Sequence, residues 1–174
     1  MDYFVNPALA LAPDRDVQVH NKFFKARESL RARAARKGIQ LRLLGQSNAQ
    51  VEGRRIFEVI PFILLENAIK YSPENLPVDI VFQETENTVS AIVRNYGPAL
   101  NLDEMGHVFE IGKRGANAEA ARISGYGIGL HFAKELVERH HQGTIEFKQT
   151  GDDMDCYGVN YRNTEIVLTF PKIR

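Results

Sequence analysis

The chain has 174 residues, the length of a single domain, and its hydrophobic content of 44% is sufficient for a buried core. Its 22 basic and 22 acidic residues cancel, so the overall charge gives no attraction to nucleic acid or to an anionic membrane. One cysteine, Cys156, excludes an intramolecular disulfide, and no apolar stretch approaches the roughly 18 residues that a membrane span needs. We therefore expect a cytoplasmic domain, alone or as the cytosolic end of a longer, membrane-anchored protein.

The N-terminal part of the sequence predicts an arm, a helix and a strand. Residues 1–15 contain two prolines and no long hydrophobic period, which is typical of an N-terminal arm or linker, so we expect the domain itself to span 16–174. Apolar residues recur at helical spacing over 16–37, and Gly38 is suited to end that helix. Residues 39–43 alternate between apolar and polar, which predicts a half-buried strand.

The middle of the chain predicts a buried helix followed by a hairpin. Residues 54–71 are apolar enough for a helix packed on a sheet, with Pro61 either distorting its first half or marking its true start. Two strands are predicted at 78–84 and 88–95, joined by a short polar turn.

The C-terminal half predicts a glycine-rich loop over 97–125, with a short helix around 102–109, and then a third main helix over 127–141. Paired strands are predicted at 144–149 and 165–170, with a long acidic loop between them. Together these elements predict an α+β fold. It is a two-layer α/β sandwich in which a mixed sheet of about five strands is covered on one face by three helices.

Two segments point to chemistry. Asn67 lies among apolar neighbours in a predicted helix, where a carboxamide costs free energy unless it is bonded, although alone it is also typical of an exposed site near a helix end. About sixty residues later, the glycine run 125–130 opens another amphipathic helix, and free N–H groups at such a start bind phosphate. The Asn67 oxygen can hold Mg²⁺, and Lys70 follows one turn later. The combination indicates a nucleotide site.

Four segments in this order resemble the ATP-binding domain of sensor histidine kinases, within the ATPase superfamily that also contains gyrase, the heat-shock chaperones and MutL. They are the segment around Asn67, residues 94–100 (Arg-Asn-Tyr-Gly-Pro-Ala-Leu), residues 108–115 (Val-Phe-Glu-Ile-Gly-Lys-Arg-Gly) and the glycine run 125–130. Each is weak alone, but four in order at this spacing are specific. The resemblance covers roughly 16–174 and implies the same two-layer fold.

The resemblance also implies ATP and Mg²⁺ as cofactors and assigns roles to individual residues. Asn67 would be the metal ligand, and Glu66, Lys70 and Arg114 would be the catalytic residues. Glu66 lies off the helix face of Asn67, and kinases of this type use an acid there to polarise the acceptor histidine. The cofactor-binding residues implied are Asn67, Lys70, Tyr71, Asn95, Gly97, Lys113, Arg114, Gly125, Tyr126, Gly127, Ile128, Gly129, Leu130 and Thr164. Glu66 is otherwise typical of a solvated charge, and so, without the resemblance, are Lys70, Lys113 and Arg114. Tyr71 is nearly as typical of a core aromatic at a helix end.

The sequence departs from the family pattern at three positions. Ile63 stands one turn before Asn67, where gyrase-like members carry a water-activating glutamate and most histidine kinases a second Asn, so efficient ATP hydrolysis is not expected. Asn95 replaces the aspartate that accepts the adenine amino proton, and the loss of charge assistance costs on the order of 1 kcal/mol. Ala99 replaces a glycine and is strained if that backbone needs a positive φ.

The function that follows is an ATP/Mg-binding catalytic module of a sensor histidine kinase. It would donate the γ-phosphoryl group to a histidine on a separate dimerisation domain, in cis or in trans, with a response regulator as an indirect partner. The setting of His20 does not match an acceptor histidine. The alternative is a degenerate nucleotide-binding or scaffold module without phosphotransfer. A gyrase-like clamp is disfavoured by Ile63, and we expect neither nucleic acid binding nor direct membrane contact.

Overall fold

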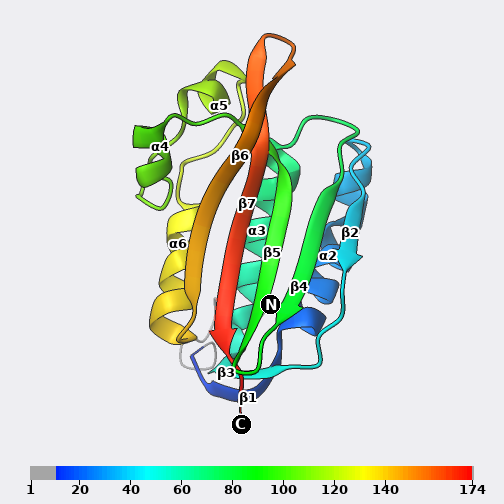
Figure 1. Cartoon of the computed structure of the whole chain (residues 1–174), viewed down its shortest axis with the longest axis vertical. Coiled ribbons are helices and arrows are strands. Elements are labelled where there is room, and N and C mark those ends of the chain that lie inside the picture. The colour runs from blue at the N-terminus through cyan, green and yellow to red at the C-terminus, as the bar shows by residue number, and fades with distance from the viewer. Residues whose placement is uncertain (1–10, 174) are drawn as a thin grey trace.

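The computed structural model describes residues 11–173, which form a five-stranded mixed sheet with three main helices against one of its faces (Figure 1). The sheet strands are β2 (Leu41–Leu44), β4 (Val78–Glu84), β5 (Thr88–Pro98), β6 (Thr144–Cys156) and β7 (Val159–Pro171). The helices are α2 (Val19–Ala35), α3 (Val59–Tyr71) and α6 (Gly129–Glu135). The strand order is β2-β4-β5-β7-β6, and β2 pairs with β4 in parallel while the other pairs are antiparallel. This arrangement confirms the predicted two-layer α+β sandwich.

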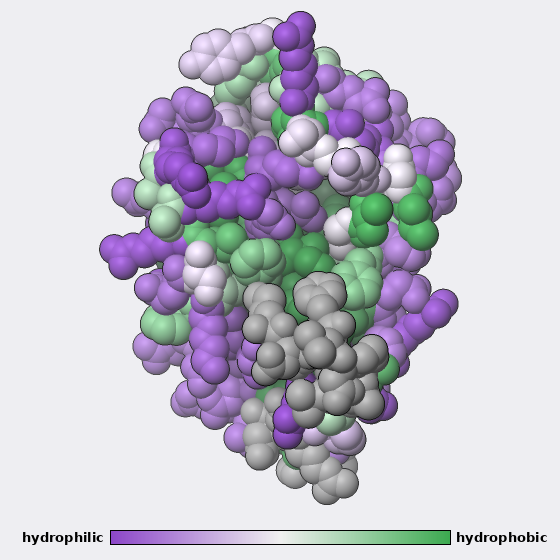
Figure 2. Space-filling model, turned by 180° about the vertical axis from the view of Figure 1, so that it is seen from behind, coloured by the Kyte–Doolittle hydropathy of each residue, from purple (hydrophilic) through white to green (hydrophobic). Residues whose placement is uncertain are grey.

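The core lies between the helices and the sheet. The buried residues of α2 recur every three or four positions and are Val19, Phe23, Ala26, Leu30 and Ala34. Helix α3 lies between α2 and α6 and also contacts β5, so it is the most enclosed of the three. Seen from the helical side in Figure 2, hydrophilic side chains dominate the periphery and hydrophobic ones gather nearer the middle. None of the described helices is long and apolar enough to cross a lipid bilayer.

The N-terminal prediction was only partly correct. Residues 1–10 of the predicted arm lie outside the described residues, and the strand β1 (Pro13–Gln18) follows them. It pairs antiparallel with another unpredicted strand, β3 (Gln50–Arg54), so α2 begins at Val19 rather than near Asp16. Neither strand has a clear apolar alternation, and each is stabilised by pairing with a segment distant in sequence, which local pattern does not reveal.

The position of Pro61 explains where α3 starts. Residues Arg55–Glu58 form a single 3₁₀ turn, and the α-helix begins at Val59, two residues before Pro61. Proline is tolerated in the first turn of a helix because its missing N–H would have no intrahelical partner there. Of the two expectations for Pro61, the second is confirmed: it marks the true start of the helix.

The prediction of a long acidic loop between the last two strands was wrong. β6 runs on to Cys156 and β7 starts at Val159, joined by a turn in which Tyr157 and Gly158 have φ of 55° and 80°. Two positive φ values are typical of a type I′ hairpin turn, but Tyr is an unusual residue for its first position, so the turn was not recognised. The extended hairpin projects at the top of Figure 1 beside the end of β5.

Residues 99–128, which we call the lid, connect β5 to α6. They contain the predicted short helix, α4 (Leu102–Gly106), and an unpredicted one, α5 (Ala116–Ala120). Asn101 and Glu104 form a capping box at the start of α4, which explains its position. α6 starts at Gly129, two residues later than expected, and ends in a π-helical turn, Leu136–His140.

His141, directly after that turn, is 1% exposed and packs edge-on against Phe57. Its Nδ1 lies 2.7 Å from the Leu136 carbonyl oxygen and its Nε2 lies 3.4 Å from that of Arg54. A neutral ring has one N–H, and the shorter contact assigns it to Nδ1, since a carbonyl only accepts. Burial lowers the pKa of His141 below its usual value near 6.5, despite the hydrogen bonds to backbone carbonyls. The folded protein therefore holds a neutral imidazole at this helix end.

We expect this histidine to make the fold less stable in mild acid. Below about pH 6.5 the unfolded chain takes up a proton at His141 that the folded chain does not, so stability falls until the pH reaches the lowered folded pKa. Thermal unfolding between about pH 7.5 and about pH 5.5 should show a smaller fall in Tm for His141→Asn than for the parent. His140→Asn is the control, and an unchanged slope in His141→Asn would contradict the assignment. The opposing effect of His107, whose pKa is raised by its hydrogen bond to Glu110, is common to all three proteins.

Candidate functional site

A cavity of about 690 Å³ lies between the end of α3, β5, β7, the lid and the start of α6. This volume is in the range of sites for small molecules, about 300–1,000 Å³. All residues predicted for the site line it, and they are Glu66, Asn67, Lys70, Tyr71, Asn95, Gly97, Lys113, Arg114, Gly125, Tyr126, Gly127, Ile128, Gly129, Leu130 and Thr164. The fold thus brings together segments that are up to about one hundred residues apart in the chain.

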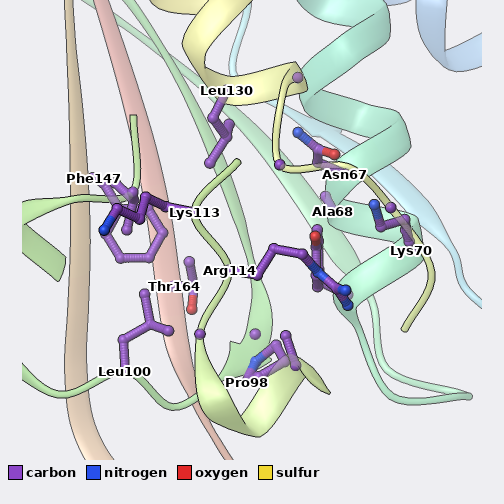
Figure 3. A pocket seen from close by; sticks show the side chains of 18 of the residues that line it. Asn67, Ala68, Lys70, Pro98, Leu100, Lys113, Arg114, Leu130, Phe147 and Thr164 are labelled. Carbon is purple, nitrogen blue, oxygen red and sulfur yellow. The ribbon is translucent and has the colours of Figure 1, made fainter. Parts of the chain in front are cut away.

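The last turns of α3 present Asn67 and Lys70 to the cavity (Figure 3). The Asn67 carboxamide makes no hydrogen bond with any other residue in the described range. The Lys70 ammonium lies 4.5 Å from the centre of the Tyr71 ring, and no carboxylate within 11–173 forms an ion pair with it. One wall of the cavity therefore offers an amide and a cation whose bonding capacity is largely unused.

This helix end is held by Lys37, from the turn after α2. Its ammonium donates to the carbonyl oxygens of Ile69, Lys70 and Ser72 at 2.9, 3.3 and 2.6 Å. The last carbonyls of a helix have no intrahelical partner, and a lysine satisfies them and complements the helix dipole. Burial lowers the pKa of Lys37, with the Glu74 carboxylate opposing the shift. The sequence analysis did not identify this residue, since its target is distant in the chain.

The glycine run lies directly against α3. A Cβ on Gly129 would stand 3.2 Å from Asn67 Nδ2, and one on Gly125 would stand 2.4 Å from the Lys70 ammonium. Gly127 has φ of 68°, and a Cβ there would come within 2.7 Å of the Lys113 carbonyl oxygen. Asn67 and the glycine run therefore lie side by side and line the same cavity.

The two lid cations point in different directions (Figure 3). Arg114 extends towards the side of the cavity formed by α3, whereas Lys113 extends away from α3. One Arg114 Nη donates to the Ile123 carbonyl, while Nε is buried with no hydrogen-bond partner among residues 11–173. A buried guanidinium N–H without an acceptor is costly. Arg114 also lines the cavity, where its guanidinium is a positive group available to an anion.

Glu66 lies at the rim and forms an ion pair with Arg33 of α2, a cavity residue that the sequence analysis missed. Its side chain is 36% exposed, so it is accessible to a group approaching from outside. Tyr126 is also at the mouth, with 87% of its surface exposed.

The far end of the cavity is a network of buried polar side chains. Asn95 and Thr164 are register partners on β5 and β7, 6% and 5% exposed. A Cβ on Gly97 would stand 2.8 Å from Thr164 Oγ1, so only glycine lets the two strands approach this closely without a shift. Ala99 has no positive φ, so the strain considered for the missing glycine is absent.

Gln149 of β6 is a further residue that the sequence analysis missed. Its Nε2 donates to the Pro98 carbonyl at 2.9 Å and to Thr164 Oγ1 at 2.8 Å, and its Oε1 accepts from the Leu100 N–H at 2.8 Å. One side chain thus joins the first residues of the lid to the sheet. It carries no motif, and the predicted strand ended at this position, so no local signal could have identified it.

The polar groups that line the cavity fit a nucleoside triphosphate that binds as its Mg²⁺ complex. No cluster of three His, Cys, Asp or Glu side chains able to hold a metal occurs within 11–173, so the protein alone offers no complete cage. Asn67 supplies one hard oxygen, and Mg²⁺ commonly combines a single protein ligand with phosphate oxygens and waters. Lys70 and the unsatisfied Arg114 Nε supply positive groups for the phosphates.

Comparison with known proteins gives a consistent result. The family described as "Histidine kinase-, DNA gyrase B-, and HSP90-like ATPase" matches residues 52–174. The sensor histidine kinase YvrG of Bacillus subtilis is 35% identical over 92 residues, which are 53% of this chain and 15% of that protein. The heme sensor protein HssS of Staphylococcus aureus is 27% identical over 103 residues, 59% of this chain and 21% of that protein. The chain thus spans less than a quarter of the length of these relatives.

Solved structures show the same fold. The mycobacterial sensor histidine kinase MprB superposes with a TM-score of 0.72 at 21% identity, covering 92% of this chain and 97% of that one. The catalytic domain of the histidine kinase ThkA gives a TM-score of 0.73 at 16% identity, covering 92% and 98%.

We expect Gln149 to stabilise the root of the lid. Gln149→Leu removes three hydrogen bonds and leaves two backbone groups without partners, which should lower the free energy of unfolding by about 1–3 kcal/mol. Urea denaturation measures this change, and limited proteolysis should show faster cleavage within 99–128. Thr150→Ala removes one exposed hydrogen bond, to Asn163, and is the matched control. Equal stability and equal cleavage in the two variants would show that Gln149 does not hold the lid.

Proposed function

Because the chain belongs to the histidine kinase-, DNA gyrase B-, and HSP90-like ATPase family, we propose that it is the ATP- and Mg²⁺-binding catalytic module of a sensor histidine kinase. It donates the γ-phosphoryl group to a histidine on a separate dimerisation domain, in cis or in trans, and a response regulator is an indirect partner. The observation that supports this most directly is the cavity wall. There, within residues 11–173, the Asn67 carboxamide makes no hydrogen bond and the Lys70 ammonium makes no ion pair, and both residues line one cavity with Arg114.

At the phosphate end, the residues act by positioning and charge neutralisation, which is most of what phosphoryl transfer requires. Asn67 would hold Mg²⁺ through its carboxamide oxygen, and the ion would supply charge neutralisation for the triphosphate. Lys70 and Arg114 contact phosphate oxygens from two sides, the helix and the lid. The N–H groups at the start of α6 face the same oxygens across Gly125–Gly129.

Glu66 takes the proton at the rim. The acceptor imidazole attacks the γ-phosphorus, the bond to the β,γ-bridging oxygen breaks, ADP leaves, and the displaced imidazole proton passes to the Glu66 carboxylate. The ion pair with Arg33 orients this carboxylate before the acceptor arrives.

Water is a poor acceptor in this site. Ile63 lies half-buried on α3, one turn before Asn67, and is next to Gly129. Its apolar side chain cannot deprotonate water, so the nucleotide is kept for transfer.

A second candidate is a degenerate module that binds nucleotide or acts as a scaffold without transfer. Ile63 and Asn95 favour it, since both replace groups that the family uses. Ala99 does not, because its backbone is unstrained. Two measurements separate the possibilities. A scaffold binds no nucleotide, a sensor binds nucleotide without phosphoryl transfer, and a kinase does both.

Calorimetry should show Mg²⁺-dependent ATP binding that is lost on removing the Asn67 oxygen. Asn67→Ala should weaken affinity by at least about tenfold with Mg²⁺ and much less with EDTA, since only the metal contact is removed. Its Tm should stay near that of the parent, because the carboxamide bonds to no described residue. Asn87→Ala, in the β4–β5 turn, is the control. No heat of binding and no thermal shift for the parent would favour the scaffold.

Mixing the chain with the dimerisation domain of a sensor kinase and labelled ATP should give acid-labile, base-stable phosphate on that domain. Free hydrolysis should remain negligible, and Glu66→Gln should slow transfer by about 10²–10⁴-fold with little change in ATP affinity. Glu86→Gln, in the β4–β5 turn, is the matched control. Steady ATP turnover without a phosphorylated acceptor would instead support an ATP-driven clamp.

A further inference from the structure

The base end of the cavity contains an amide whose orientation is determined by a neighbour. Asn95 lines the cavity and is 6% exposed, with its Nδ2 donating to Ser72 Oγ at 3.2 Å. Its oxygen accepts no hydrogen bond from the described residues, and part of its surface is accessible from the cavity. A carboxamide can present either its acceptor or its donors to a ligand, so its rotation decides which base it accepts.

The Ser72 hydroxyl makes two hydrogen bonds in only one arrangement, as a donor to Ala68 and an acceptor from Asn95. It donates to the Ala68 carbonyl oxygen at 2.7 Å, which leaves lone pairs and no proton for Asn95. The Ser72 backbone is fixed at both groups, since its N–H also bonds Ala68 and its carbonyl accepts from Lys37. The serine is 3% exposed, so water does not compete for these bonds.

Rotating the carboxamide by 180° would cost one of these bonds. The Asn95 oxygen would then face Ser72 Oγ, and the hydroxyl proton would have to leave Ala68 to bond it. The observed orientation has two hydrogen bonds and the rotated one has a single bond, a difference of about tenfold in population.

The other neighbour does not reorient Asn95. Thr164 Oγ1 donates its only proton to the Arg162 carbonyl at 3.0 Å and accepts from Gln149 Nε2. It therefore has no proton for the Asn95 oxygen, and that oxygen remains free for a ligand.

We propose that the Ser72 hydroxyl, by fixing the Asn95 carboxamide with its oxygen towards the cavity, makes the site selective for a purine with an amino group at position 6. This inference rests on the proposed function, since it concerns the base of the same nucleotide. An adenine amino group donates to the Asn95 oxygen. A purine with an oxo group at position 6, held in the same pose by its triphosphate, brings an acceptor against an acceptor. Ser72 is a positioning residue, and Asn95 is the group that touches the base.

The test compares ATP with inosine triphosphate, which differs at the 6-oxo group and the N1 proton, by calorimetry with Mg²⁺ on the purified chain. The parent should prefer ATP by about tenfold or more, and Ser72→Ala should reduce that ratio by about fivefold to tenfold, because the amide is then free to turn. Ser72→Thr keeps a hydroxyl and should keep the ratio. Asn95→Asp presents only acceptors, so adding Ser72→Ala to it should leave the ratio unchanged.

Ser90→Ala is the matched control, because Ser90 loses a comparable hydrogen bond, to Thr169, away from the cavity. If Ser72→Ala does not unfold cooperatively, Ser72→Cys keeps the volume with a weak donor and gives the same comparison. Equal affinity of the parent for both nucleotides, or an ATP preference unaffected at Ser72, overturns this inference while leaving the kinase module intact. A parent that binds neither nucleotide overturns the proposed function as well.

Discussion

The site depends on how one helix ends. Helix α3 carries Asn67 and Lys70 on its last turns, and Lys37 donates to the carbonyls of Ile69, Lys70 and Ser72. Because the third of these carbonyls belongs to the first residue beyond the helix, the ammonium sets the direction in which the chain leaves it. A partly buried ammonium is costly, which is the reason for its lowered pKa, and three acceptors offset that cost. With the helix end held, the phosphate-facing and base-facing groups keep a constant separation.

The two ends of the cavity are built on opposite principles. At the base end, Gln149 donates to Thr164, Thr164 donates to the Arg162 carbonyl, and Asn95 donates to Ser72, so most of the polar groups there are hydrogen-bonded within the protein. At the phosphate end, Asn67 is unbonded and Arg114 Nε has no acceptor among the described residues. A satisfied network holds one geometry and recognises shape, whereas unsatisfied groups gain free energy when a charged ligand arrives. This division suits a nucleotide whose base must be discriminated and whose phosphate must be transferred.

The sequence predicted the fold class, and the residues it proposed for the site all line one cavity, because both depend on local signals. Asn67 lies at a helical position among apolar residues, and the glycine run needs conformations that few other residues adopt. What it missed depends on contacts distant in the chain. Lys37 and Gln149 bond to backbone more than thirty and more than forty residues away, as their hydrogen bonds show. The β6–β7 extension was missed because Tyr157 gives no turn signal and the pairing through Tyr161 to Pro98 joins distant segments.

The placement of acids around the cavity favours transfer to a protein group over hydrolysis. Glu104 is committed to the lid, since it accepts from the N–H groups of Asn101 and Ala116. Asp103 lies 3.6 Å from His107 on the same helix turn. Beside Asn67, where a base would have to hold an attacking water, the helix carries Ile63. The remaining acid on α3, Glu66, lies at the rim and is paired with Arg33. A proton acceptor at the rim cannot activate water deep in the cavity, but it meets an imidazole presented from outside. This placement supports the proposal that the nucleophile comes from another domain rather than from solvent.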